Sequence, residues 1–384
     1  MKNIKLSYLL TYLDSSWFWL GIWLLYYLKF TNYAGVGILE TTAFTALTLA
    51  EIPTGALADL FGKKKTLIIG FIFSAFASFI MGTATQFNHL LVSLFILAIG
   101  GALRSGTLEA LQYDSLKDEG LDKKYDKVVS NTNTVRNVAF ALSAVVGGYM
   151  YAHQPGLPFI VLGVFFIVAA IICAFLVEPK TDTEKFSWKN YKEQTIKGFE
   201  SLFNKKAKIP TQSLLSVSIL TFVIYQFIDG SLALEFGFNE RQLGALASII
   251  YIVSAITSQS TSKILGKSEH TKKFLYIAML SALTLAVSPI VTLYVGGIIL
   301  ILRQSFFTLM DNVSSVVINK NTQSNVRSTT ISTYNMIRNF PYILTAFFIG
   351  NIIDVYSASS FALVMSFVIF FSSIFSLIRL NKHK

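Results

Sequence analysis

The chain has 384 residues, of which 53% are hydrophobic and only 14% are charged. A soluble domain carries about 25% charged residues, so the composition argues against a soluble protein and favours one embedded in a membrane. The formal net charge of +11 does not indicate a nucleic-acid partner, because the basic residues are spread over many short polar segments.

Twelve mostly apolar stretches follow one another along the chain, and each is long enough to cross a bilayer as a helix. We predict spans at 6–28, 34–58, 66–86, 89–112, 129–151, 157–177, 210–230, 241–263, 273–290, 292–318, 328–351 and 357–379. The apolar start is too long for a signal peptide, contains Asp14 and lacks a small-residue cleavage site, so we expect it to be retained. The pattern predicts an all-α membrane protein with twelve transmembrane helices.

The basic residues indicate how these spans are oriented. If the N-terminus lies inside, the outer loops contain only Lys29 and Arg241, while the inner segments hold nearly all the other Lys and Arg residues. Four further arginines lie within spans, at 104, 136, 303 and 338. The positive-inside rule therefore predicts cytoplasmic N- and C-termini.

The chain divides into two halves of six spans each, 1–178 and 209–384, joined by a polar segment at 179–208. That segment is interpreted equally well as an amphipathic helix at the inner membrane surface or as a flexible linker. SNTNTVRN at 130–137 returns as STYNMIRN at 332–339, so that Asn133 and Arg136 correspond to Asn335 and Arg338. Duplicated halves are typical of secondary transporters, with the binding site near the midplane between them. We therefore expect two pseudo-symmetric halves.

The loop between the second and third spans reads EIPTGALADLFGKKK, at 51–65. It resembles the signature G-x-L-A-D-R/K-x-G-R/K-R/K of the major facilitator superfamily, except that Leu60 stands where a basic residue is usual. The matching residues are Gly55, Leu57, Ala58, Asp59, Gly62, Lys63 and Lys64. The segments EIPTG at 51–55 and EALQYD at 109–114 resemble those of bacterial family members near the drug:proton antiporters.

The resemblance implies a cytoplasmic gate in which Asp59 pairs with Lys63 and with Asp114 at the inner end of the fourth span. A carboxylate at this level is stabilised by a cation and by the positive end of a neighbouring helix. The alternative is that the lysines only set topology; Gly55, Asp59 and Gly62 are not needed for that, so a gate is favoured.

Charged side chains inside the spans cost about 2.5–3.5 kcal/mol each and normally face a partner or a cavity. Counting residues from the inner ends at about 1.5 Å each places Glu109 level with Arg136. The same count places Asp311 level with Arg338. We predict both as ion pairs with a structural or gating role favoured over substrate contact. Asp14 lies at a depth from which it could meet Arg104.

Asp14 is the first candidate for proton coupling, because it lies in a span that lines the cavity in the resembled family. The aromatic residues beside it are Trp17, Trp19, Trp23 and Tyr26, together with Phe18. Such surroundings favour proton exchange near neutral pH and suit a lipophilic cation. The alternative is an aromatic belt at the lipid face. Glu40 is a weaker coupling candidate, and we expect Asp229, Glu235 and Glu240 to be solvated near the outer end of the seventh span.

No nucleotide-binding motif occurs, so we expect no cofactor and a proton gradient as the energy source. Cys173 is alone and the four histidines are not spaced as ligands, so no metal site is expected. The sequence predicts a multi-pass transporter of the bacterial inner membrane, not an enzyme, that exports small amphipathic compounds or drugs. By analogy it is a monomer. The alternatives are an importer or uniporter of a small metabolite or organic anion, and a membrane sensor or scaffold that transports nothing.

Overall fold

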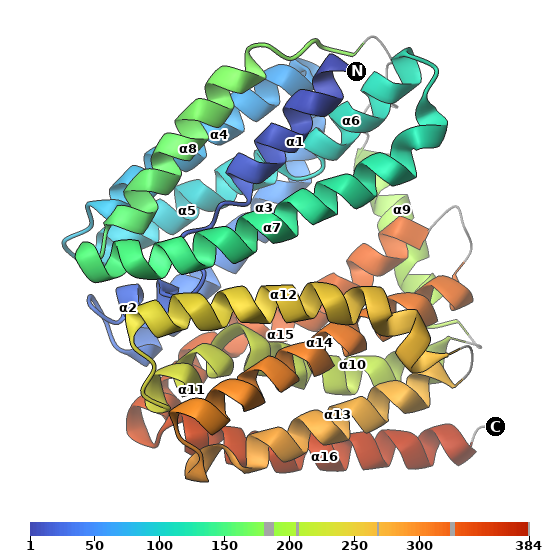
Figure 1. Ribbon diagram of the computed structural model, residues 1–384. Coiled ribbons are helices and arrows are strands. Elements are labelled where there is room, and N and C mark those ends of the chain that lie inside the picture. Colours follow the sequence, from blue (N-terminus) through green and yellow to red (C-terminus); the bar gives the residue numbers. More distant parts are fainter. Residues whose placement is uncertain (180–187, 205–206, 267–268, 323–326, 383–384) are drawn as a thin grey trace. The chain divides into compact units, whose positions relative to one another are not determined.

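The computed structural model describes residues 1–179, 188–204, 207–266, 269–322 and 327–382 (Figure 1). All regular elements of the described residues are helical. Contacts between them divide the chain into two compact units. Unit 1 comprises Met1–Ser187 and Glu240–Tyr251, and unit 2 comprises Trp188–Asn239 and Ile252–Lys384.

Unit 1 is a bundle around one apolar core. Its helices are α1 (Lys2–Asp14), α2 (Trp23–Tyr27), α3 (Tyr33–Phe61), α4 (Lys63–Gly82), α5 (Phe87–Arg104), α6 (Thr107–Asp118), α7 (Tyr125–His153) and α8 (Leu157–Cys173). α4 packs against α5 and α8, and α1 packs against α7 and α8. Leu10 of α1, Phe71 of α4 and Phe166 of α8 meet in the core, which fixes the helices that carry the charged side chains described below.

Unit 2 repeats this arrangement. Its helices are α9 (Trp188–Leu202), α10 (Lys208–Val223), α11 (Asp229–Glu235), α12 (Glu240–Leu265, whose first part belongs to unit 1), α13 (His270–Ala286), α14 (Leu293–Asn321), α15 (Arg327–Val355) and α16 (Ala358–Lys382). α13 packs against α14 and α16, and α10 packs against α15 and α16. These contacts correspond one for one to those of α4 and α1 in unit 1, as expected of duplicated halves. The polar segment contributes α9, which packs along α15.

Nine stretches of the described residues are helical, long and apolar enough to cross a membrane, and α8 is a shorter apolar helix. The predicted first span at 6–28 is not a single helix, because α1 ends at Asp14 and a run of turns leads to the five residues of α2. The Ser16 hydroxyl donates to the Tyr12 carbonyl at 2.7 Å, and serine side chains compete in this way with helix continuation. The predicted fourth span is broken similarly at Gly106, which has φ 72°.

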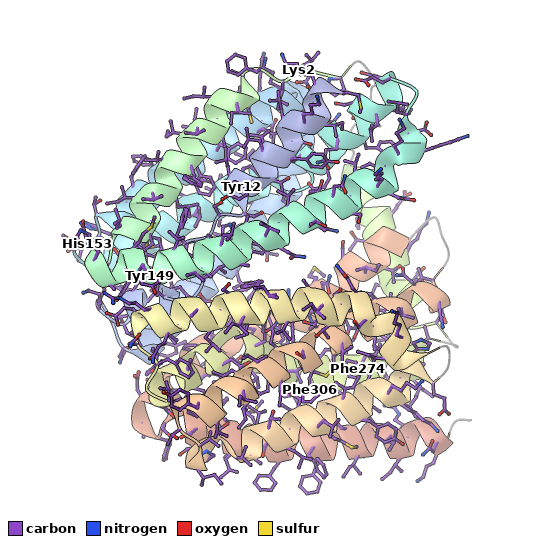
Figure 2. All side chains as sticks on the ribbon, viewed as in Figure 1. Lys2, Tyr12, Tyr149, His153, Phe274 and Phe306 are labelled. Atoms are coloured by element: carbon purple, nitrogen blue, oxygen red, sulfur yellow. The ribbon has the colours of Figure 1, made fainter. Side chains whose placement is uncertain are left out.

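Large apolar side chains project from the outer faces of the helices of both units (Figure 2). Phe76 on α4 is 59% exposed, and Phe371 on α16 is 63% exposed. A soluble protein rarely exposes so much contiguous apolar surface. These faces therefore fit the hydrocarbon core of a bilayer, and the protein is a multi-pass membrane protein.

Candidate functional site

In unit 1, Asp14 and Arg104 form an ion pair. Asp14 is the last residue of α1 and Arg104 the last residue of α5, so both side chains lie where a helix is interrupted. Arg104 Nε is 3.0 Å from Asp14 Oδ1, and the two side chains are 10% and 30% exposed. This contact is the one that the depth count suggested, and the predicted role of Asp14 in proton coupling stays a prediction.

The aromatic residues after Asp14 do not act as one group. The Trp17 indole N–H donates to the Asp14 carbonyl at 2.8 Å, and the Trp17 ring stacks on Trp19 with centroids 5.0 Å apart. Trp23 lies edge-on to Tyr27. Tyr26 is 2% exposed and its hydroxyl donates to the Met81 carbonyl, so Tyr26 holds α2 to α4. Trp17 and Trp19 are therefore the two rings of this group that stack beside Asp14, and their predicted role in binding stays a prediction.

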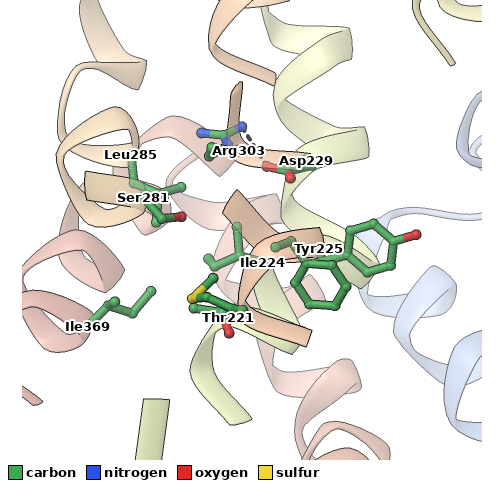
Figure 3. A pocket seen from close by; sticks show the side chains of 10 residues that line it. Thr221, Ile224, Tyr225, Asp229, Ser281, Leu285, Arg303 and Ile369 are labelled. Carbon is green, nitrogen blue, oxygen red and sulfur yellow. Dashed lines mark ion pairs between the residues drawn. The ribbon is translucent and has the colours of Figure 1, made fainter. Parts of the chain in front are cut away.

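Unit 2 contains a matching pair that sequence reasoning missed. Arg303 Nη2 is 2.5 Å from Asp229 Oδ1, and the side chains are 2% and 19% exposed (Figure 3). Asp229 follows a π-helical turn, Ile224–Ile228, a feature often found at functional sites. The expectation that Asp229 is solvated was wrong, because the wide turn aims this side chain at α14. The sequence did contain a signal for this pair. The first and fourth spans, which hold Asp14 and Arg104, correspond to the seventh and tenth spans, which hold Asp229 and Arg303.

A small cavity in unit 2 borders the Asp229–Arg303 pair. The stacked rings of Tyr225 and Phe307, 4.2 Å apart, form one wall. Thr221 and Ser281 supply hydroxyl groups (Figure 3). Glu235 is exposed, as expected, and its carboxylate accepts hydrogen bonds from the first backbone N–H groups of α16, at 2.9 Å for Ser359, so it caps that helix.

The two charge pairs placed level by counting residues are in contact. Arg136 Nη2 is 3.4 Å from Glu109 Oε1, and Arg338 Nη1 is 2.6 Å from Asp311 Oδ1. Each pair links neighbouring helices of one unit, α6 to α7 and α14 to α15. Their structural or gating role stays a prediction.

The polar residues of the repeat are used differently in the two units. Asn133 Oδ1 accepts from Arg136 Nη1 at 3.5 Å, whereas Arg338 Nε donates to Asn339 Oδ1 at 3.1 Å. Asn335 is half-buried on α15. Each arginine of the repeat is thus contacted by an asparagine. Arg136 uses Asn133 and Arg338 uses Asn339, and these two asparagines do not occupy equivalent positions.

The predicted gate is described in part. Lys63 Nζ contacts Asp114 Oδ2, and Asp114 is 1% exposed. Gly62 has φ 85°, a left-handed conformation that glycine adopts readily, and it turns the chain into α4. Gly55 and Asp59 belong to α3, but the side chains of 51–61 lie outside the described ones.

Glu178 completes this end of unit 1. Its carboxylate accepts from the backbone N–H groups of Lys63 at 2.6 Å and Lys64 at 2.9 Å. A carboxylate at a helix N-terminus is stabilised by the helix dipole. By holding the first residues of α4, Glu178 helps to keep Lys63 beside Asp114. Glu178 was not predicted, because only the fold brings the end of the sixth span to the start of the third.

Glu40 lies on α3, near enough to Tyr27 to interact with it electrostatically. No three His, Cys, Asp or Glu side chains gather as a metal site would require in the part of the chain that the structure describes. Among the described residues, carboxylate–arginine pairs join neighbouring helices within each unit, as expected of charged side chains in membrane-spanning segments.

Two bundles of apolar helices with the same packing pattern and internal ion pairs define the class of helical membrane transporters. The family model of the Major Facilitator Superfamily matches residues 6–346. The chain therefore belongs to the Major Facilitator Superfamily, whose members are transporters and not enzymes.

Known proteins similar to this chain include transporters of different substrates. Multidrug resistance protein 1 of Bacillus subtilis (strain 168) is 25% identical over 67% of this chain and 65% of its own length. The uridine/deoxyuridine transporter of Lactococcus lactis subsp. cremoris (strain MG1363) is 26% identical over 41% of this chain and 33% of its own length. The matched stretches thus span less than two thirds of either relative. The crystal structure of the nucleoside transporter NupG shares the fold, with a TM-score of 0.79 and 15% identity over 98% of both chains.

Proposed function

We propose that this chain is a secondary active transporter of the bacterial inner membrane that exports small amphipathic compounds in exchange for protons. It works by alternating access, as a monomer with twelve transmembrane helices, two six-helix halves and cytoplasmic termini. The proton gradient supplies the energy. The similarity to multidrug resistance protein 1 supports this proposal, as does the pairing of the four arginines within spans with carboxylates.

The observation that carries the proposal is that each arginine inside the predicted spans has a carboxylate within 3.4 Å. A transported organic anion would need a cation that is not already neutralised. A neutral or cationic amphipathic compound needs apolar and aromatic surface instead, and a carboxylate that can release its proton. Asp14, beside the stacked rings of Trp17 and Trp19, supplies both.

Purified protein in liposomes tests this function. Vesicles loaded with acid and a pH-sensitive dye receive lipophilic cations, antibiotics, nucleosides and small organic anions in turn. Cationic compounds should release protons from the vesicles, and Asp14→Asn should abolish the release. Asp126→Asn is the matched control, because Asp126 is an exposed carboxylate in the first turn of α7. Proton movement driven only by anions, or by no compound, overturns the export proposal.

Uptake of an uncharged metabolite is the second candidate function. It is favoured by the similarity to the uridine/deoxyuridine transporter, and the stacked rings of Tyr225 and Phe307 would suit a planar base. In the same assay uridine would then enter together with protons and the cations would have no effect. A sensor or scaffold would move none of the compounds.

A further inference from the structure

Arg104 is held by more than its carboxylate. The Arg104 guanidinium carbon lies 5.0 Å from the ring centroid of Phe71 and 4.8 Å from that of Phe166. Its Nη1 donates to the Ser74 hydroxyl and, at 3.4 Å, to the Gly70 carbonyl. The guanidinium is thus enclosed by groups of α4 and α8 as well as by Asp14 of α1.

The chain makes room for this arrangement. A Cβ atom on Gly70 would lie 2.8 Å from Arg104 Cγ, so glycine is required for the arginine to lie against α4. Phe71 and Phe166 are 0% and 1% exposed, and their own rings are 6.1 Å apart. Because both rings are fixed in the core, they present their faces to the cation whatever the state of Asp14.

The matching pair of unit 2 lacks this support. Arg303 Nη1 has the Ser288 hydroxyl at 3.3 Å, but no aromatic face lies against Arg303 among the described residues of the unit. Removing the charge of Asp229 would leave a buried cation without compensation. Removing the charge of Asp14 would leave Arg104 between two ring faces, which attract a cation most strongly when it is shielded from water.

We propose that Phe71 and Phe166 are positioning residues that hold Arg104 when Asp14 is protonated, and thereby set the pH at which Asp14 takes up its proton. This inference rests on the proposed role of Asp14 in proton exchange. A guanidinium that shares its charge with a carboxylate is attracted to a ring less than a free one. The rings therefore favour the state in which Asp14 is neutral.

The described titratable groups around Asp14 come from neighbouring helices. Arg104 faces it from α5, and Cys173 of α8 interacts electrostatically with Asp14, Arg104 and Lys64. The ion pair between α6 and α7 joins Glu109 to Arg136. Arg104 contacts the Asp14 carboxylate directly, and the two rings act on Asp14 through Arg104.

Fluorination of Phe166 tests the inference, since fluorine weakens the negative face of the ring and hardly changes its shape. The full-length protein is prepared with mono-, di- and trifluorophenylalanine at 166. Protonation of Asp14 is then followed by infrared spectroscopy as the carboxylic acid band that Asp14→Asn removes. The midpoint pH should fall with each added fluorine, by about 0.5 pH unit across the series. The same series at Phe165, whose ring lies edge-on to Phe18, should not move the midpoint.

Superimposed titrations of the Phe166 series, a rise of the midpoint, or an equal shift for Phe165 would each overturn the inference. Because the titration needs no transport, its result is separate from that of the liposome assay. A shift without proton-coupled transport would support the positioning role and reject the export proposal. An Asp14 band that does not titrate at all would overturn both.

Discussion

At the scale of single residues, the molecule contains two carboxylate–arginine pairs of the same design and different surroundings. Asp229–Arg303 is the more deeply buried pair, with an arginine 2% exposed. Asp14–Arg104 has a carboxylate 30% exposed and an arginine with other contacts. A buried pair is costly to break on one side only, because the remaining charge has no compensation. Breaking the Asp229–Arg303 pair on one side should therefore cost more stability than breaking the Asp14–Arg104 pair.

Asp229→Asn should lower the free energy of unfolding by about 3 kcal/mol, whereas Asp14→Asn should lower it much less. The double variant Asp229→Asn/Arg303→Gln should recover most of the loss, because no unpaired charge remains. Thermal unfolding of the purified protein in detergent gives the comparison. Equal losses for Asp229→Asn and Asp14→Asn would contradict the distinction between the pairs.

Residue counting was sufficient for some of these contacts. Glu109 and Arg136 lie on regular helices, where depth follows from position because each residue rises about 1.5 Å. Asp229 could not be placed in this way, because a π-helical turn precedes it and changes the direction of every later side chain. The capping role of Glu178 was also beyond reach, since it depends on how three distant segments meet.

At the scale of helices, close packing depends on glycine at a few crossings. A Cβ on Gly147 of α7 would lie 1.6 Å from the carbonyl oxygen of Phe18, in the turns between α1 and α2. Backbone atoms of this kind cannot move aside as a flexible side chain can. The turns that interrupt the first span therefore pack directly against Gly147 of α7. Trp17 and Trp19 lie in these same turns.

Gly147→Ala should destabilise unit 1 by about 3 kcal/mol or more, because α7 must move away from the turns. Gly101→Ala on α5 is the control, since the nearest atom to its Cβ would be 4.0 Å away. That substitution should be neutral or stabilising by about 0.5–1 kcal/mol, as expected for alanine in a helix interior. Unfolding temperatures of both variants distinguish the two cases, and a neutral Gly147→Ala would refute the close crossing.

At the scale of the whole molecule, the duplicated plan was visible in the sequence because SNTNTVRN and STYNMIRN recur in equivalent spans. The packing of α4 and α13 against corresponding neighbours agrees with it. Apolar length indicated the membrane class, but it could not reveal that α1 stops at Asp14 or that α5 stops at Arg104. Those interruptions come from local hydrogen bonding and backbone conformation, and they are where the charged residues meet.

The proposed orientation in the membrane can be tested on one helix. α7 has 29 residues, or about 44 Å of helix, which exceeds the hydrocarbon thickness of about 30 Å. In a Cys173→Ala background, Asp122→Cys should react only with a thiol reagent supplied from the cytoplasmic side. Gln154→Cys should react only with a reagent supplied from outside. Both positions are exposed, so labelling of the two from the same side would contradict the topology.

The Asp14–Arg104 pair also bears on how the protein is made. Asp14 precedes Arg104 by 90 residues in the sequence, and translation at about 5–20 residues per second separates their synthesis by roughly 5–20 s. During that interval the first segment enters the bilayer without its cationic partner, where a neutral carboxylic acid costs less than a carboxylate. The contact between α1 and α5 can therefore form only after α5 has been made, so the closing of unit 1 around this pair is a late step of its assembly.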